Sequence, residues 1–110
     1  MNWIPLKTST QLDEINTHTQ GYSIIFKHST RCSISLMAKK MFEHDWDNLS
    51  TAQPVFLLDL LKFRELSTRV AQTFDVKHES PQLLIIKNGI YIFNASHDQI
   101  SAEEAIKQLG

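Results

Sequence analysis

The sequence predicts an α/β fold in which a small mixed β-sheet is flanked by helices on both faces. An apolar strand-like run, a helical stretch and a second strand-like run follow one another in the first half of the chain. That order requires parallel pairing of the two strands. In the second half, two more apolar runs are joined through Asn88 and Gly89, which favour an antiparallel hairpin because both tolerate positive φ.

The N-terminal part of the chain predicts one helix and the first central strand. A run of hydroxyl side chains beginning at Thr8 can cap a helix that buries Leu12 and Ile15. This helix should end before Gly21. Residues 22–26 are rich in β-branched and aromatic side chains and have the length of a buried strand.

The longest predicted helix begins near Cys32. After the polar run at 27–31, apolar residues recur at the i, i+3, i+4, i+7 and i+8 spacing of a helical stripe. Trp46 should pack near the end of this helix rather than stack on a ligand. The residues expected on the buried face are Ile34, Met37, Ala38, Met41 and Phe42.

The rest of the chain supplies the remaining strands and helices. Pro54 opens a buried-strand run at 55–58. Ser67 can cap a helix that extends to Phe74, and a capping box at 101–104 starts the last helix. The other expected strands occupy residues 83–86 and 90–93, with a short edge strand at 3–6, and the last helix should bury Ala105, Ile106 and Leu109.

Length, charge and cysteine content limit the class of protein. The 110 residues, with a net charge of -1 at pH 7, predict a single domain over residues 1–110. The balanced charge disfavours nucleic acid and anionic membranes as partners. Apolar runs reach only four residues, far short of the ~20 that span a bilayer, and the start lacks a signal sequence. A cytoplasmic protein with a reduced thiol is therefore expected.

The cysteine at position 32 is the strongest candidate for chemistry. A lone cysteine is often an inert buried hydrophobe, but this one lies at a strand-to-helix turn, where free N–H groups favour a thiolate. Lys27, His28 and Arg31 lie close in sequence. Ser35 follows three residues after Cys32 and cannot form a disulfide with it. A group bound to Cys32 would therefore have to be released by a thiol of another molecule.

Other potential sites give weaker signals. Pro81 opens a buried-strand run, which suggests a strand start with a cis bond, although an ordinary trans turn proline is the commoner case. The five histidines lack metal-site spacing, so no metal is expected. The chain also lacks a glycine-rich phosphate loop and a Gly-x-Ser-x-Gly elbow.

The combination of a strand, a cysteine at the next helix start, and a proline before a hairpin and final helix resembles the thioredoxin-like pattern. Three short segments make the resemblance more specific: Lys-His-Ser at 27–29 leading to Cys-Ser-Ile-Ser at 32–35, His-Glu-Ser-Pro-Gln at 78–82, and Ala-Ser-His at 95–97. Together they resemble the YtxJ-like monothiol bacilliredoxins of the bacillithiol redox system. That family usually has proline where this chain has Ser33. The buried carboxylate of dithiol thioredoxins, six residues before the cysteine, is replaced by Phe26.

The resemblance implies a reaction and a set of site residues. Cys32 would take bacillithiol from a bacillithiolated protein, and a second bacillithiol, acting as co-substrate with no bound cofactor, would release it. Ser35 is expected to hydrogen-bond the thiolate, and Arg31, Lys27 or His78 to meet the carboxylates of bacillithiol. The implied set is Cys32 and Ser35 as catalytic residues and Arg31, Ser33, Ser80, Pro81, Lys27 and His78 as substrate-binding residues.

Two alternatives stay open. The replacement of the family proline by Ser33 is compatible with a thioredoxin-fold module that binds partner proteins without turnover. The second alternative is a monothiol glutaredoxin-like protein that uses glutathione or an iron–sulfur cluster. The 78–82 segment fits a bacilliredoxin better. The sequence does not fix an oligomeric state.

Overall fold

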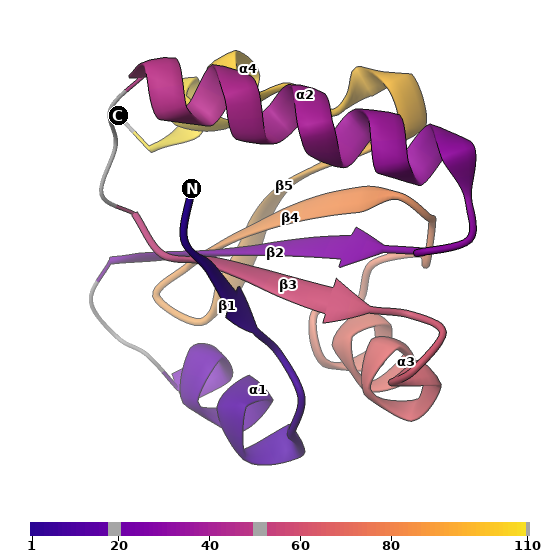
Figure 1. The fold of residues 1–110 in the computed structure, drawn as a ribbon. Helices are drawn as coiled ribbons and strands as arrows, with labels where there is room; N and C mark the ends of the chain where they lie inside the picture. The colour runs from indigo at the N-terminus through magenta and orange to yellow at the C-terminus, as the bar shows by residue number, and fades with distance from the viewer. Residues whose placement is uncertain (18–20, 50–52, 110) are drawn as a thin grey trace.

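The computed structural model describes residues 1–17, 21–49 and 53–109. Five strands and four α-helices form the chain in the described part (Figure 1). Their order is β1 (Trp3–Pro5), α1 (Ser9–Thr17), β2 (Tyr22–His28), α2 (Ser33–Leu49), β3 (Val55–Asp59), α3 (Arg64–Thr73), β4 (Gln82–Lys87), β5 (Ile90–Ser96), a 3-10 turn (His97–Gln99) and α4 (Ala102–Gln108).

The strands form one mixed sheet in the order β1-β3-β2-β4-β5. β3 pairs in parallel with both β1 and β2, whereas β4 pairs antiparallel with β2 and β5. In Figure 1, α2 and α4 cover one face of the sheet, and α1 and α3 cover the other. The predicted α/β class, the parallel front half and the antiparallel hairpin are confirmed.

Each face of the sheet has its own apolar core. Along β2, Ile24 and Phe26 pack toward α2 and α4, while Ile25 packs toward α1 and α3. All three side chains have no exposed surface. Because both faces are covered, the middle of this central strand is continuously apolar rather than alternating, as the buried-strand prediction required.

The turn signals predicted from the sequence have the expected geometry. Asn88 and Gly89 both have positive φ, 54° and 78°, between β4 and β5. The Ser101 hydroxyl accepts a hydrogen bond from the Glu104 amide at 3.3 Å and so caps α4. These two signals depend only on neighbouring residues, which explains why the sequence alone could predict them.

The buried stripe predicted for α2 is only partly right, because the helix is rotated about its axis. Phe42 is buried and Ala38 packs against the core as predicted. Ile34, Met37 and Met41 are about 60% exposed, at 59%, 61% and 59%, whereas Phe42 and Trp46 are buried. The rings of Phe42 and Trp46 stack at 5.3 Å, and Phe42 also contacts Trp3 and Phe26 of the sheet. Large aromatic side chains gain the most from burial, so they determine which face of α2 meets the sheet.

The predicted start of α3 at Ser67 is also wrong. The helix begins at Arg64, and Ser67 is a buried residue in its first turns rather than a cap. The connection before the helix is held instead by Asp59, whose carboxylate accepts from the amides of Leu61 and Lys62. An Asp side chain that accepts from amides two and three residues later stabilises the turn before a helix, so the helix start here does not depend on a serine cap.

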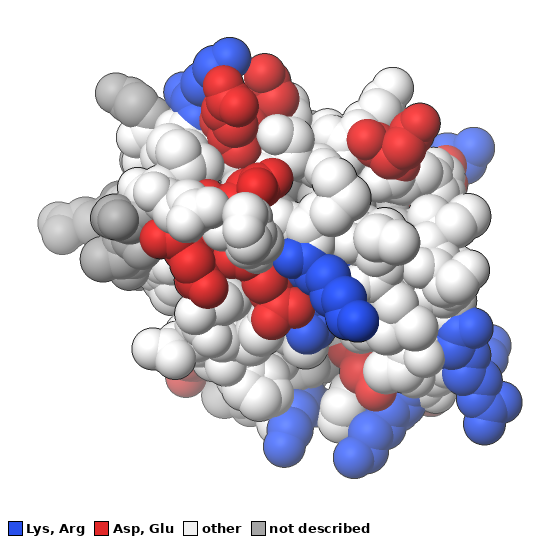
Figure 2. Space-filling model, turned by 45° about the horizontal axis from the view of Figure 1, so that its top comes forward, with Lys and Arg blue, Asp and Glu red and all other residues white. Residues whose placement is uncertain are grey.

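No helix in the described ranges is long and apolar enough to cross a membrane. On the face shown in Figure 2, carboxylates gather over the middle and upper part, and lysines and arginines lie mostly toward the lower and right margins. This face has no broad basic surface, in agreement with the balanced charge of the sequence.

Candidate functional site

Cys32 lies at the point where the chain passes from β2 into α2. Its amide donates to the Ser29 carbonyl at 3.2 Å, and its own carbonyl accepts from the Leu36 amide at 3.0 Å. Cys32 is therefore the N-cap residue of a 17-residue helix. Cys32 is half-buried and lies at the positively polarised end of the helix.

The Ser80–Pro81 peptide is cis and lies at the same end of the sheet as Cys32. Gln82 follows directly and pairs with Lys27 across β4 and β2. This register places Pro81 beside the end of β2, from which the chain leads to Cys32. The Pro81 carbonyl accepts from the His97 amide at 3.0 Å, which ties the cis peptide to the segment after β5.

Ser35 has a partner that the sequence analysis did not anticipate. Its hydroxyl, with no exposed surface, lies 2.6 Å from Nδ1 of His28 and accepts from the Ser29 amide at 3.0 Å. Within the described residues, no hydrogen bond joins Ser35 to Cys32. His28 was missing from the predicted site, although its spacing of two from Phe26 places it on the same sheet face, beneath α2.

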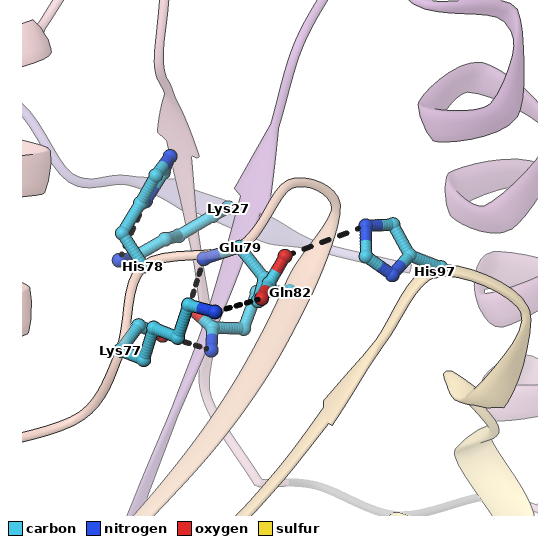
Figure 3. Close-up of polar contacts among 6 residues, drawn as sticks. All are labelled: Lys27, Lys77, His78, Glu79, Gln82 and His97. Atoms are coloured by element: carbon cyan, nitrogen blue, oxygen red, sulfur yellow. Dashed lines mark hydrogen bonds and ion pairs between the residues drawn. The ribbon is translucent and has the colours of Figure 1, made fainter.

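Lys27 points to the opposite face of the sheet and has no exposed surface. Burial lowers its pKa to about 8. Its Nζ atom lies 3.3 Å from Nδ1 of His78 (Figure 3). Burial, and then the charge of Lys27, lower the pKa of His78 against the opposing effect of Glu79. Lys27 therefore has no exposed surface with which to touch a substrate directly in this conformation, contrary to the expectation.

A small polar network holds the segment that precedes the cis peptide. Gln82 donates to the Lys77 carbonyl at 3.0 Å and accepts from the Glu79 amide at 3.4 Å. The Glu79 carboxylate lies 3.8 Å from the Lys77 ammonium and 3.6 Å from His97. Figure 3 shows these side chains converging from the segment before β4 and from the end of β5. The network fixes the backbone on both sides of Ser80.

A cavity of about 820 Å³ lies between α3 and the segment before the cis peptide. Ser29 and Ser80 line it beside the cysteine loop, and His78, Arg64 and Lys77 contribute basic groups. Arg31 lies in a separate hollow of about 360 Å³, together with Arg64. Of the predicted basic residues, His78 therefore lines the larger depression and Arg31 the smaller one, whereas the buried Lys27 lines neither. Ser33 and Ser80 are at least partly exposed near Cys32.

A sequence model of the family described as monothiol bacilliredoxin BrxC matches residues 4–105. The chain belongs to the monothiol bacilliredoxin family. The match runs from within β1 into α4 and contains every element between them. The family and the fold together support a thiol oxidoreductase.

Solved structures agree on the fold. A protein provisionally assigned as an oxidoreductase with a thioredoxin fold is similar with 28% identity and a TM-score of 0.82, over 94% of this chain and 90% of that chain. The reduced thioredoxin pre-protein of Schistosoma mansoni has 17% identity and a TM-score of 0.76, over 100% of both chains. The thioredoxin of Malassezia sympodialis has 18% identity and a TM-score of 0.73, over 98% and 90%. The fold of this family member is therefore the thioredoxin fold.

Proposed function

We propose that the chain removes bacillithiol from protein mixed disulfides, with Cys32 as the nucleophile. The observation that carries the proposal is the accessible Cys32 at the N-terminus of α2, with Ser35 where a dithiol site would hold its second thiol. Free amides at a helix N-terminus stabilise a thiolate both as the attacking group and as the leaving group. Membership of the monothiol bacilliredoxin family supports this choice of reaction.

In the first step, the Cys32 thiolate attacks the bacillithiol sulfur of the mixed disulfide. A new S–S bond forms between Cys32 and bacillithiol, the old S–S bond breaks, and the protein leaves as a thiolate that takes a proton from solvent. The electron count is unchanged because one disulfide replaces another.

In the second step, the thiolate of a free bacillithiol attacks the bacillithiol sulfur held on Cys32. Bacillithiol disulfide leaves, and Cys32 returns as a thiolate. Ser35 cannot perform this attack because a hydroxyl does not displace a thiol from a disulfide. The overall reaction converts one mixed disulfide and one bacillithiol into a protein thiol and bacillithiol disulfide, so the cell must reduce that disulfide by another reaction.

Groups around Cys32 suit both partners in the exchange. Ser80, next to the cis Pro81, offers backbone groups to an extended substrate segment, as in strand addition. Arg31 in the smaller hollow can attract the carboxylates of bacillithiol, and the neutral ring of His78 in the larger cavity can donate a hydrogen bond to one of them. Ser33 is exposed beside Cys32, where it can contact the bound thiol. A thiol kept ready for this exchange fits the reducing cytoplasm.

The test is turnover of a bacillithiolated protein with free bacillithiol, followed through the recovery of the protein thiol. The wild type should accelerate recovery, and Cys32→Ser should not. A parallel reaction with a glutathionylated protein and glutathione separates the two thiols. Faster turnover with glutathione would contradict bacillithiol as the co-substrate, and no turnover with either would favour a binding module.

A further inference from the structure

His28 and Ser35 form a buried pair that links the sheet to the first turn of α2. Their side chains are 4% and 0% exposed, and the His28 Nδ1 to Ser35 Oγ distance is 2.6 Å. His28 comes from the end of β2, and Ser35 lies three residues into the helix after Cys32. No step proposed above uses His28.

The hydrogen bonds of Ser35 determine whether the proton between Ser35 Oγ and His28 Nδ1 belongs to the hydroxyl or to the ring. The Ser35 oxygen accepts from the Ser29 amide, and because the hydroxyl is buried, its O–H also needs an acceptor within the protein. Among the described residues, Nδ1 of His28 is the acceptor within hydrogen-bond distance. A buried hydroxyl is rarely left without a partner. Nδ1 is therefore unprotonated, the ring proton is on Nε2, and His28 is neutral.

The charges packed around His28 agree with a neutral ring. Burial, followed by the charge of Lys39 on α2, lowers the pKa of His28. Asp59 on β3 and Glu43 on α2 oppose this effect without reversing it. At neutral pH the ring therefore remains able to accept the hydroxyl proton of Ser35.

The position of Ser35 connects this pair to the thiol. Residues three apart at the start of a helix share a face, so the side chains of Cys32 and Ser35 lie at the same end of α2. We infer that His28 is a positioning residue that acts on Cys32 through Ser35, by holding the hydroxyl proton away from the sulfur. When His28 can no longer accept, the hydroxyl turns to the thiolate and stabilises it. This role assumes a reactive Cys32 but not bacillithiol as its partner.

The experiment measures the rate of Cys32 alkylation by iodoacetamide against pH, a reaction that requires no bacillithiol. His28→Phe removes the acceptor, so the pH at half-maximal rate should fall by about one unit, the effect of one hydrogen bond to a charged group. His28→Asn supplies an amide oxygen near the position of Nδ1 and should restore the wild-type profile. Circular dichroism melting confirms that each variant is folded.

A double-mutant cycle separates action through Ser35 from a direct effect of His28. Ser35→Ala removes the hydroxyl, so adding His28→Phe to this variant should leave its alkylation profile unchanged. An equal shift in both backgrounds would overturn the inference, as would a folded His28→Phe variant with an unshifted profile.

A measurement on the wild type tests the proton assignment without any substitution. The ¹⁵N chemical shifts of the His28 ring should show an unprotonated Nδ1 and a protonated Nε2 at neutral pH. The opposite tautomer would leave the hydroxyl proton free to face the thiol and would overturn the inference. Failure of bacillithiol turnover with this ring assignment intact would count against the proposed function alone.

Discussion

Nζ of Lys27 lies 3.3 Å from Nδ1 of His78 beneath α3, so a fully buried lysine and an exposed histidine share one partly buried contact. The contact can form only if at least the imidazole is neutral, because two cations would repel. Burial lowers the pKa of both groups, that of Lys27 from 10.5 to about 8. Because folding lowers both pKa values, this pair makes the stability of the protein depend on pH.

Lys27→Met should remove the pH dependence of the free energy of unfolding between about pH 8 and pH 10.5. Between pH 8 and pH 10.5, the unfolded chain binds the Lys27 proton more tightly than the folded chain does, so wild-type stability from this group rises with pH. At pH 7 the variant should be more stable than the wild type by about 1–3 kcal/mol, since methionine needs no hydration. Urea unfolding at a series of pH values measures the gap, which should close toward pH 10.5. A constant gap would contradict the assignment.

Ser35→Ala should destabilise the protein although it removes one oxygen atom. The Ser29 amide and His28 would lose their partner, and an unsatisfied buried group costs about 1–3 kcal/mol. Ser33→Ala, two residues earlier on the same helix and exposed, is the matched control and should change stability by less than about 0.5 kcal/mol. Equal effects in chemical unfolding would show that the Ser35 bonds contribute nothing.

The rotation of α2 about its axis leads to another comparison. Phe42→Ala should cost about 3–5 kcal/mol because Phe42 is 1% exposed, whereas Met41→Ala should cost less than about 0.5 kcal/mol at 59% exposure. Thermal melts of the two variants measure the difference. Similar losses at both positions would instead support the stripe predicted from the sequence.

Sequence patterns predicted the order of elements because each strand and most helix ends depend on nearby residues. The rotation of α2 could not be predicted, since both possible faces are apolar and the choice depends on contacts of Phe42 with Trp3 and Phe26, distant in sequence. The burial of Lys27 depends in the same way on His78.

In the candidate site, too, local features could be predicted from the sequence and contacts between distant residues could not. Local spacing predicted that Cys32 lies before a helix and that Pro81 lies before a strand. The partner of Ser35 could not be predicted in this way. Lys27 and His28 are neighbours in a polar run, and nothing local in that run indicates that both side chains are buried, one on each face of the sheet. The period of two along β2 was the available signal.

Ser33→Pro restores the residue typical of the family at the first position of α2. Proline is favoured there because its fixed φ suits a helix start and the missing N–H has no partner within the helix. The substitution should stabilise the chain by about 0.4–1 kcal/mol in urea unfolding by restricting the unfolded state. A clear loss of stability would mean that the backbone at Ser33 departs from a standard helix start.

The central claim is that Cys32 alone carries the transferred thiol. Intact mass spectrometry after mixing the reduced protein with an excess of a bacillithiolated protein tests it directly. The wild type should gain one bacillithiol and keep it until free bacillithiol is added, Cys32→Ser should gain none, and Ser35→Cys should lose it again by forming a disulfide with Cys32. Transfer to the Cys32→Ser variant, or no transfer to a wild type whose Cys32 alkylates readily, would contradict the account.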